Sequence, residues 1–118
     1  MNYLLIFVGG GLGCLSRYLI SITSLRFYSG NFPMGTFISN VLACLVLAFA
    51  VGLMSKGMLE QRWIKMGLII GFCGGFSTFS TFSFETVQLI KNGNHLVAVG
   101  NIILSVAVCL ILLYKLTK

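Results

Sequence analysis

Four long apolar segments, separated by short polar connections, dominate the chain. They cover about residues 3–25, 34–54, 64–90 and 95–114. Each reaches the roughly 20 apolar residues that a helix needs to cross the hydrocarbon core of a bilayer. The connections at 26–33, 55–63 and 91–94 are too short to form a domain outside the membrane. The pattern predicts an all-α integral membrane protein, with residues 1–118 forming a single four-span domain.

Composition supports a membrane location. Of the 118 residues, 58% are hydrophobic and only 8% are charged, whereas soluble domains carry about 25% charged residues. In a soluble protein the net charge of +6 could indicate nucleic-acid binding. Here the basic residues other than Arg17 lie near the ends of the spans, where they act as interfacial anchors and topology signals. We therefore expect contact with membrane lipid and none with nucleic acid.

The distribution of basic residues also predicts an orientation. With an even number of spans, both termini lie on one side of the membrane, together with the 55–63 connection. Arg26 and Lys91 belong to the opposite side. Cytoplasmic regions are enriched in Lys and Arg, so the larger group favours cytoplasmic termini. That group is Lys56, Arg62, Lys65, Lys115 and Lys118.

The third apolar segment is interrupted by the run GFCGGFSTFSTF at residues 71–82. Glycines, hydroxyl residues and phenylalanines replace the aliphatic side chains that lipid favours. Irregular backbone at membrane depth occurs only where it is buried in protein or lines a polar cavity. The run predicts a third helix broken at 74–79, at a place where an ion or small solute is handled.

Several polar residues lie inside the other spans. Thr36 and Asn40 share one helical face, either as hydrogen-bonding contacts between helices or with Asn40 donating to a permeating ion. Arg17 lies deep in the first span, where it either lines a vestibule that attracts an anion or extends to the interface. The fourth span repeats a polar or small residue every fourth position, which predicts either a polar line facing a cavity or a packing seam: Asn101, Ser105 and Cys109.

Phe79 and Phe82 are three residues apart and share a face of the resumed third helix. Such phenylalanines usually pack in a core or face lipid. The edge of an aromatic ring is electropositive, however, so an edge-on ring can contact an anion without a permanent charge. Neighbouring hydroxyls could replace part of the anion's hydration shell, and the unwound carbonyls of 74–77 would suit a small cation.

Glycines and cysteines favour packing roles. Gly9 and Gly13 form a GxxxG pair, and a second series of glycines follows the same spacing in the third span. The cysteines fall one in each span without a CxxC motif, which is typical of small apolar packing residues: Cys14, Cys44, Cys73 and Cys109.

Three segments together resemble the fluoride channel family, called Fluc or CrcB: GGGLGCLSRY in the first span, GTFISN in the second and GFCGGFSTFSTFSFE in the third. The resemblance implies a passive, fluoride-selective channel that exports fluoride from the cytoplasm and relieves its toxicity. It further implies an antiparallel, dual-topology homodimer in the cell membrane, specifically a bacterial cytoplasmic membrane. Some members of the family pair two oppositely oriented homologous chains, so a heterodimer remains an alternative to the homodimer.

The resemblance also assigns roles to residues. Phe79 and Phe82 correspond to the pore phenylalanines, and Asn40 to the pore amide with Thr36 near it. The main-chain carbonyls of Gly74 and Ser77 would hold a structural Na⁺ at the dimer centre. Pore hydroxyls would come from Ser80, Thr81 and Ser105. Many members carry Tyr where Asn101 stands, and Ser or Gly where Cys109 stands.

Two other classes of membrane protein are alternatives to a channel. A proton-coupled small multidrug exporter also has four spans, but its mechanism needs a carboxylate in the membrane, usually in the first span. The first span here has none. A lysis or assembly protein that transports nothing would give no reason for the interrupted third span. No ATP site is visible either, so the sequence predicts a passive channel and not an enzyme.

Overall fold

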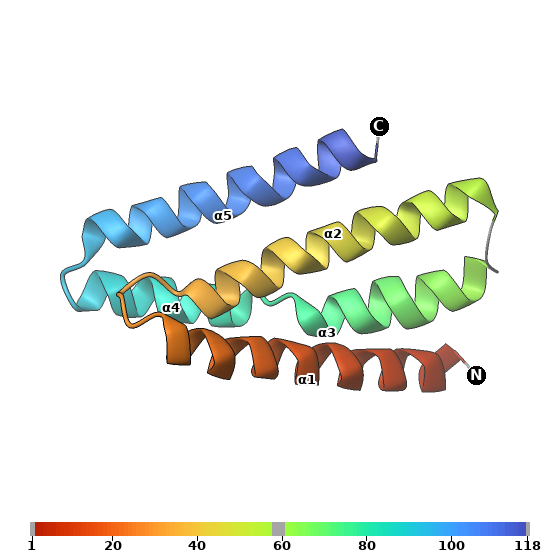
Figure 1. Cartoon of the computed structure of the whole chain (residues 1–118), viewed down its shortest axis with the longest axis horizontal. Helices are drawn as coiled ribbons and strands as arrows, with labels where there is room; N and C mark the ends of the chain where they lie inside the picture. Colours follow the sequence, from red (N-terminus) through yellow and green to blue (C-terminus); the bar gives the residue numbers. More distant parts are fainter. Residues whose placement is uncertain (1, 58–60, 118) are drawn as a thin grey trace.

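The computed structural model describes residues 2–57 and 61–117 as a bundle of helices (Figure 1). Three spans are continuous helices: α1 (Asn2–Phe27), α2 (Met34–Lys56) and α5 (His95–Leu116). The third span is divided into η1 (Trp63–Cys73), α3 (Gly74–Phe76) and α4 (Ser80–Lys91). No strand occurs in the described ranges. The expected all-α fold with four helical spans is confirmed.

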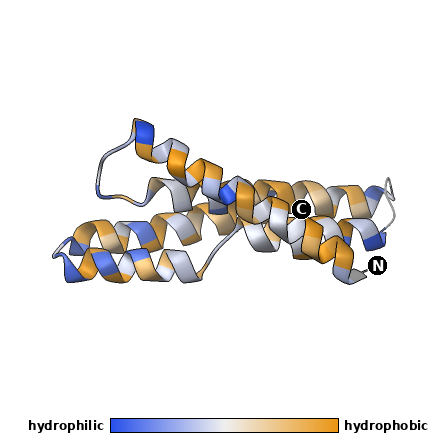
Figure 2. Ribbon diagram, turned by 90° about the horizontal axis from the view of Figure 1, so that it is seen from below, coloured by the Kyte–Doolittle hydropathy of each residue, from blue (hydrophilic) through white to orange (hydrophobic). Residues whose placement is uncertain are grey.

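The spans match the hydropathy pattern closely. Helices long and apolar enough to cross a membrane extend over Tyr3–Phe27, Met34–Lys56, Trp63–Lys91 and His95–Leu116. Hydrophilic residues gather toward the ends of the bundle (Figure 2). The longest dimension is 48 Å, comparable to the 40–45 Å of a bilayer with its headgroups.

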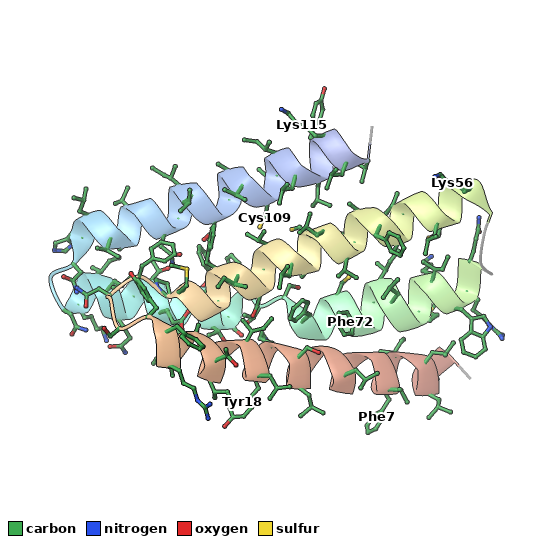
Figure 3. All side chains as sticks on the ribbon, in the orientation of Figure 1. Phe7, Tyr18, Lys56, Phe72, Cys109 and Lys115 are labelled. Atoms are coloured by element: carbon green, nitrogen blue, oxygen red, sulfur yellow. The ribbon has the colours of Figure 1, made fainter. Side chains whose placement is uncertain are left out.

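α1 packs along η1 and α3, α2 lies between η1 and α5, and α4 pairs with α5 (Figure 1). Phe7 and Tyr18 point outward from α1 (Figure 3). Lys56 and Lys115 lie toward the end of the bundle that carries both termini (Figure 3). Lys118, which the sequence places on the same side, lies outside the described residues.

The contact between α1 and the third span depends on glycines. A Cβ atom at Gly9 would overlap the Gly67 carbonyl oxygen, and one at Gly13 would overlap that of Phe72. A Cβ at Gly75 would likewise overlap the Gly10 carbonyl oxygen. Small residues in this spacing let two helix backbones approach closely. The opposing segment, η1, is a π-helix, an uncommon form that is frequent at functional sites.

The third span is broken where Ser77 leaves the helical conformation, with φ −82° and ψ 159°. α4 resumes at Ser80, so residues 77–79 separate two helical segments. The expected break at 74–79 is thus narrower than predicted. Gly74 keeps helical dihedrals, φ −63° and ψ −37°, and the segment ending at Phe76 completes the first half of the span. The next residue, Gly75, packs closely against α1, and the residues after Phe76 form the break.

Candidate functional site

A groove of about 270 Å³ opens beside the break, between α2, α4 and α5. Its lining combines a few neutral polar side chains with phenylalanines and thiols. The lining residues are Asn40, Cys44, Ser77, Thr78, Phe79, Phe82, Ser105, Val106 and Cys109. No charged side chain is among them. The groove brings together residues of three spans that the sequence singled out separately.

Asn40 holds the backbone of the break. The Thr78 N–H donates to Asn40 Oδ1 at 2.8 Å, and Asn40 Nδ2 donates to the Thr78 carbonyl oxygen at 3.3 Å. One side-chain amide therefore replaces the helical partners that residue 78 loses at the break. Nδ2 carries a second hydrogen, and Asn40 lines the groove. The two alternatives for Asn40, contact between helices and donation to an ion, are geometrically compatible.

The hydroxyl of Thr78 organises the start of α4. Thr78 Oγ1 accepts the Thr81 N–H at 3.1 Å, as a residue capping a helix N-terminus does. Ser80 Oγ lies 3.4 Å from the same oxygen. Ser80 and Thr81 are not among the residues that line the groove. Thr78 belongs to the polar run at residues 71–82, and the sequence alone assigned it no role at the site.

Phe79 and Phe82 both line the groove, with ring centroids 5.9 Å apart and planes inclined at 38°. Phe79 is 79% exposed, although it lies between two halves of a membrane span. Phe82 is half-buried. An exposed ring on the rim of a groove is available to a second surface, and it is not part of the core of a single chain.

A buried hydrogen-bond network joins α4 and α5 next to the groove. Ser105 Oγ donates to Asn101 Oδ1 at 3.1 Å, and Asn101 Nδ2 donates to Thr86 Oγ1 at 3.0 Å. The Thr86 hydroxyl then donates to the Phe82 carbonyl oxygen at 2.8 Å. The network links Ser105 in the groove to the backbone of a groove phenylalanine. Thr86 was missed in the sequence. The available signal is that residues 86 and 101 lie at similar distances from the turn joining α4 and α5.

Arg17 is half-buried and points toward the break. Its Nε donates to the Gly75 carbonyl oxygen at 3.1 Å. This carbonyl lies near the C-terminal end of a helical segment, where a positive charge is favourable. Arg17 is not among the residues that line the groove.

The two carbonyls assigned to sodium remain available. The Ser77 N–H and hydroxyl both donate to Cys73 O, and the Thr78 N–H is bound by Asn40. None of the hydrogen bonds found around the break in the described ranges ends on the carbonyl of Gly74 or Ser77. Unpaired carbonyl oxygens are hard ligands of the type that Na⁺ takes. The donor chemistry therefore fits, although one chain supplies only these two oxygens.

Thr36 lies apart from the groove. It is buried and lines a separate cavity of about 130 Å³ together with Glu85, Ser21, Ser24 and Tyr28. Glu85 Oε1 is buried there without a hydrogen-bond partner. Thr36 was expected near Asn40 because the two share a helical face. The structure directs one toward α1 and the other toward the break.

Fold and site together define a class: a four-span membrane protein with a narrow neutral groove beside a break in its third span. The family model for CrcB-like protein, Camphor Resistance (CrcB), matches residues 4–115. The chain belongs to this family.

Three relatives of this chain carry the same name. Proteins named fluoride-specific ion channel FluC occur in Clostridium perfringens, 41% identical over 92% of this chain and 84% of the relative, and in Pyrococcus abyssi, 43% identical over 94% and 89%. A protein of the same name from Phocaeicola vulgatus is 47% identical over 78% of this chain and 75% of the relative.

Proposed function

We propose that this chain forms a passive, fluoride-selective channel that exports fluoride from the cytoplasm. The observation that carries the proposal is the groove, in which Asn40, Ser105 and two phenylalanines lie together beside the broken span. Membership of a family whose relatives are named fluoride-specific ion channels points to the same ion.

The lining suits a small anion that must also leave again. Amide and hydroxyl donors can replace part of the hydration shell of fluoride, and the electropositive ring edges of Phe79 and Phe82 add weak attraction. No fixed positive charge lines the groove, so no single site binds the ion too tightly for conduction. Arg17, close to the break, contributes a longer-range attraction for anions.

The driving force needs no coupled reaction. Neutral HF crosses membranes from an acidic medium and dissociates in the more alkaline cytoplasm, where the anion is trapped. An electrically negative interior then drives fluoride outward, by about 2.3 kcal/mol per 100 mV. A selective pore is sufficient for export. We place it in the bacterial cytoplasmic membrane.

We further propose that two copies assemble antiparallel, as a dual-topology homodimer. The groove is open along one side, and Phe79 on its rim is largely exposed. A second copy would close the groove into a pore. The same assembly would let the Gly74 and Ser77 carbonyls of both chains hold a structural Na⁺, whose charge would offset that of nearby anions.

Purified protein in liposomes tests the proposal. With a potassium fluoride gradient and valinomycin, in buffer that contains Na⁺ on both sides, we expect fluoride efflux, and with potassium chloride none above protein-free vesicles. Equal efflux of both ions would contradict fluoride selectivity. Light scattering of the detergent-solubilised protein should give twice the chain mass of 12.9 kDa. A monomer that conducts fluoride would reject the dimer while leaving the channel intact.

A further inference from the structure

Two thiols face each other inside the groove, one helical turn beyond its polar donors. Cys44 follows Asn40 by four residues on α2, and Cys109 follows Ser105 by four on α5. The two helices run in the same direction (Figure 1). A step of four residues therefore leads the same way along the groove from Asn40 to Cys44 as from Ser105 to Cys109. Cys109 points from α5 toward α2 (Figure 3). Both cysteines are half-buried and line the groove, and their thiols are close enough to interact.

The other two cysteines have different surroundings. Cys14 is exposed on α1. Cys73 is buried, and its thiol donates to the Ala43 carbonyl oxygen at 3.6 Å without lining the groove. Within residues 2–57 and 61–117, no three His, Cys, Asp or Glu side chains gather into a metal site. The groove therefore offers two sulfur ligands and no third ligand of these types.

We propose that Cys44 and Cys109 form a two-thiol site for a soft, thiophilic metal ion, and that the bound ion closes the groove. Thiolate sulfur selects soft metals, and a pair of ligands suits an ion that accepts linear two-coordination, such as Hg²⁺. Zinc is disfavoured because its protein sites provide three or four ligands.

The binding step involves proton release and no redox change. Each S–H bond gives up its proton, and each sulfur electron pair forms one bond to the ion. With a divalent ion, two positive charges on the metal balance two thiolates. The product is electrically neutral, which matters inside a membrane where an uncompensated charge is costly. The bound ion would lie between α2 and α5, level with the thiols. Closure of the fluoride path by this ion rests on the proposed function, whereas the metal site itself does not.

Mercuric ion binding to the full chain tests the site directly. The background is the Cys14→Ser/Cys73→Ser variant, which keeps only the groove pair. We expect it to hold one Hg²⁺ per chain against an excess of a competing monothiol, measured by mass spectrometry of the metal after gel filtration. In a separate titration with a mercuric salt and no competing thiol, binding should release two protons. Adding Cys44→Ser or Cys109→Ser should each abolish retention. If either single-thiol chain retains the ion as firmly as the background, the two-thiol site is rejected.

Fluoride efflux from liposomes tests closure. Hg²⁺ should remove most of the efflux of the background variant, and a dithiol that extracts the metal should restore it. A chain with serine at all four cysteine positions, compared with its own metal-free rate, should be unaffected. If the background binds Hg²⁺ but conducts equally, closure is wrong. If no variant passes fluoride even without metal, the proposed function has failed, and the binding measurement still decides the site.

Discussion

Asn40 and Thr78 are joined by two hydrogen bonds, one to each polar group of the Thr78 backbone. The pair connects the second span to the break in the third, across 38 residues of sequence. The side chain expected to face an ion thus also fixes the backbone around which the groove forms. Position and function of the site depend on the same amide.

Replacing Asn40 with Leu should therefore impair both folding and conduction. Leu has a similar volume but leaves the N–H and carbonyl of Thr78 without partners, at a cost of roughly 1–3 kcal/mol for buried groups. We expect a lower melting temperature in detergent and loss of most fluoride efflux. Asn31→Leu, in the exposed α1–α2 connection, is the matched control and should change neither. If Asn40→Leu conducted fluoride as well as wild type, the Asn40–Thr78 hydrogen bonds would not be needed for the pore.

The groove phenylalanines should matter through their ring edges. Phe79→Ile and Phe82→Ile retain an apolar side chain but remove the electropositive edge. Fluoride efflux should fall sharply in both, while light scattering still reports an intact dimer. Phe84 is 64% exposed on the same helix and does not line the groove, so Phe84→Ile should conduct normally. Equal loss in all three variants would indicate a general packing effect.

The sequence was sufficient to predict the four spans, because lipid requires long uninterrupted apolar runs. The break was also readable, since Gly, Ser and Thr replace aliphatic residues there. The short length of the break, residues 77–79, could not be predicted from the sequence. Gly74 remains helical and Gly75 packs against α1, and composition alone cannot separate such glycines from residues that unwind.

Partners across helices were harder to predict. Thr36 and Asn40 share a face by spacing, yet they line different cavities. The two residues lie about one turn apart along α2, and the neighbours that each turn contacts depend on how the helices cross in the bundle. Thr86 gave no signal by itself because a single Thr near the end of a span usually bonds to its own helix backbone, as Thr86 also does.

The Thr86–Asn101 contact should be measurable as a coupling energy. Thr86→Val removes the hydroxyl that accepts a hydrogen bond from Asn101 Nδ2. Asn101 is only 1% exposed. Each of Thr86→Val and Asn101→Leu should lower the unfolding free energy by roughly 1–3 kcal/mol. The double variant should be destabilised by less than the sum, because each single change already breaks the shared bond. Strict additivity would mean that the bond contributes nothing.

Two glycines on α1 provide a steric test of the close helix contact. Gly13→Ala would force a Cβ into the Phe72 carbonyl and should destabilise the protein by roughly 1–3 kcal/mol, typical of overpacking. Gly11 has no atom of another residue within 4 Å of the corresponding Cβ position. Gly11→Ala should be neutral or slightly stabilising, since Ala favours helix more than Gly does. Similar thermal denaturation of the two variants would place α1 farther from η1.

Sodium dependence is expected to survive loss of the Ser77 side chain. The Ser77 hydroxyl bonds to Cys73 O on its own helix, so Ser77→Ala should cost only about 0.5–1.5 kcal/mol. The carbonyl proposed to hold Na⁺ is unchanged by that substitution. We therefore expect both wild type and Ser77→Ala to lose the dimer and fluoride efflux when Na⁺ is replaced by N-methylglucamine, and to regain them with Na⁺. Light scattering and efflux in the two salts measure this. If wild type remains dimeric and conducting without Na⁺, the structural cation is wrong; if only Ser77→Ala loses its dependence, the hydroxyl and not the carbonyl is the ligand.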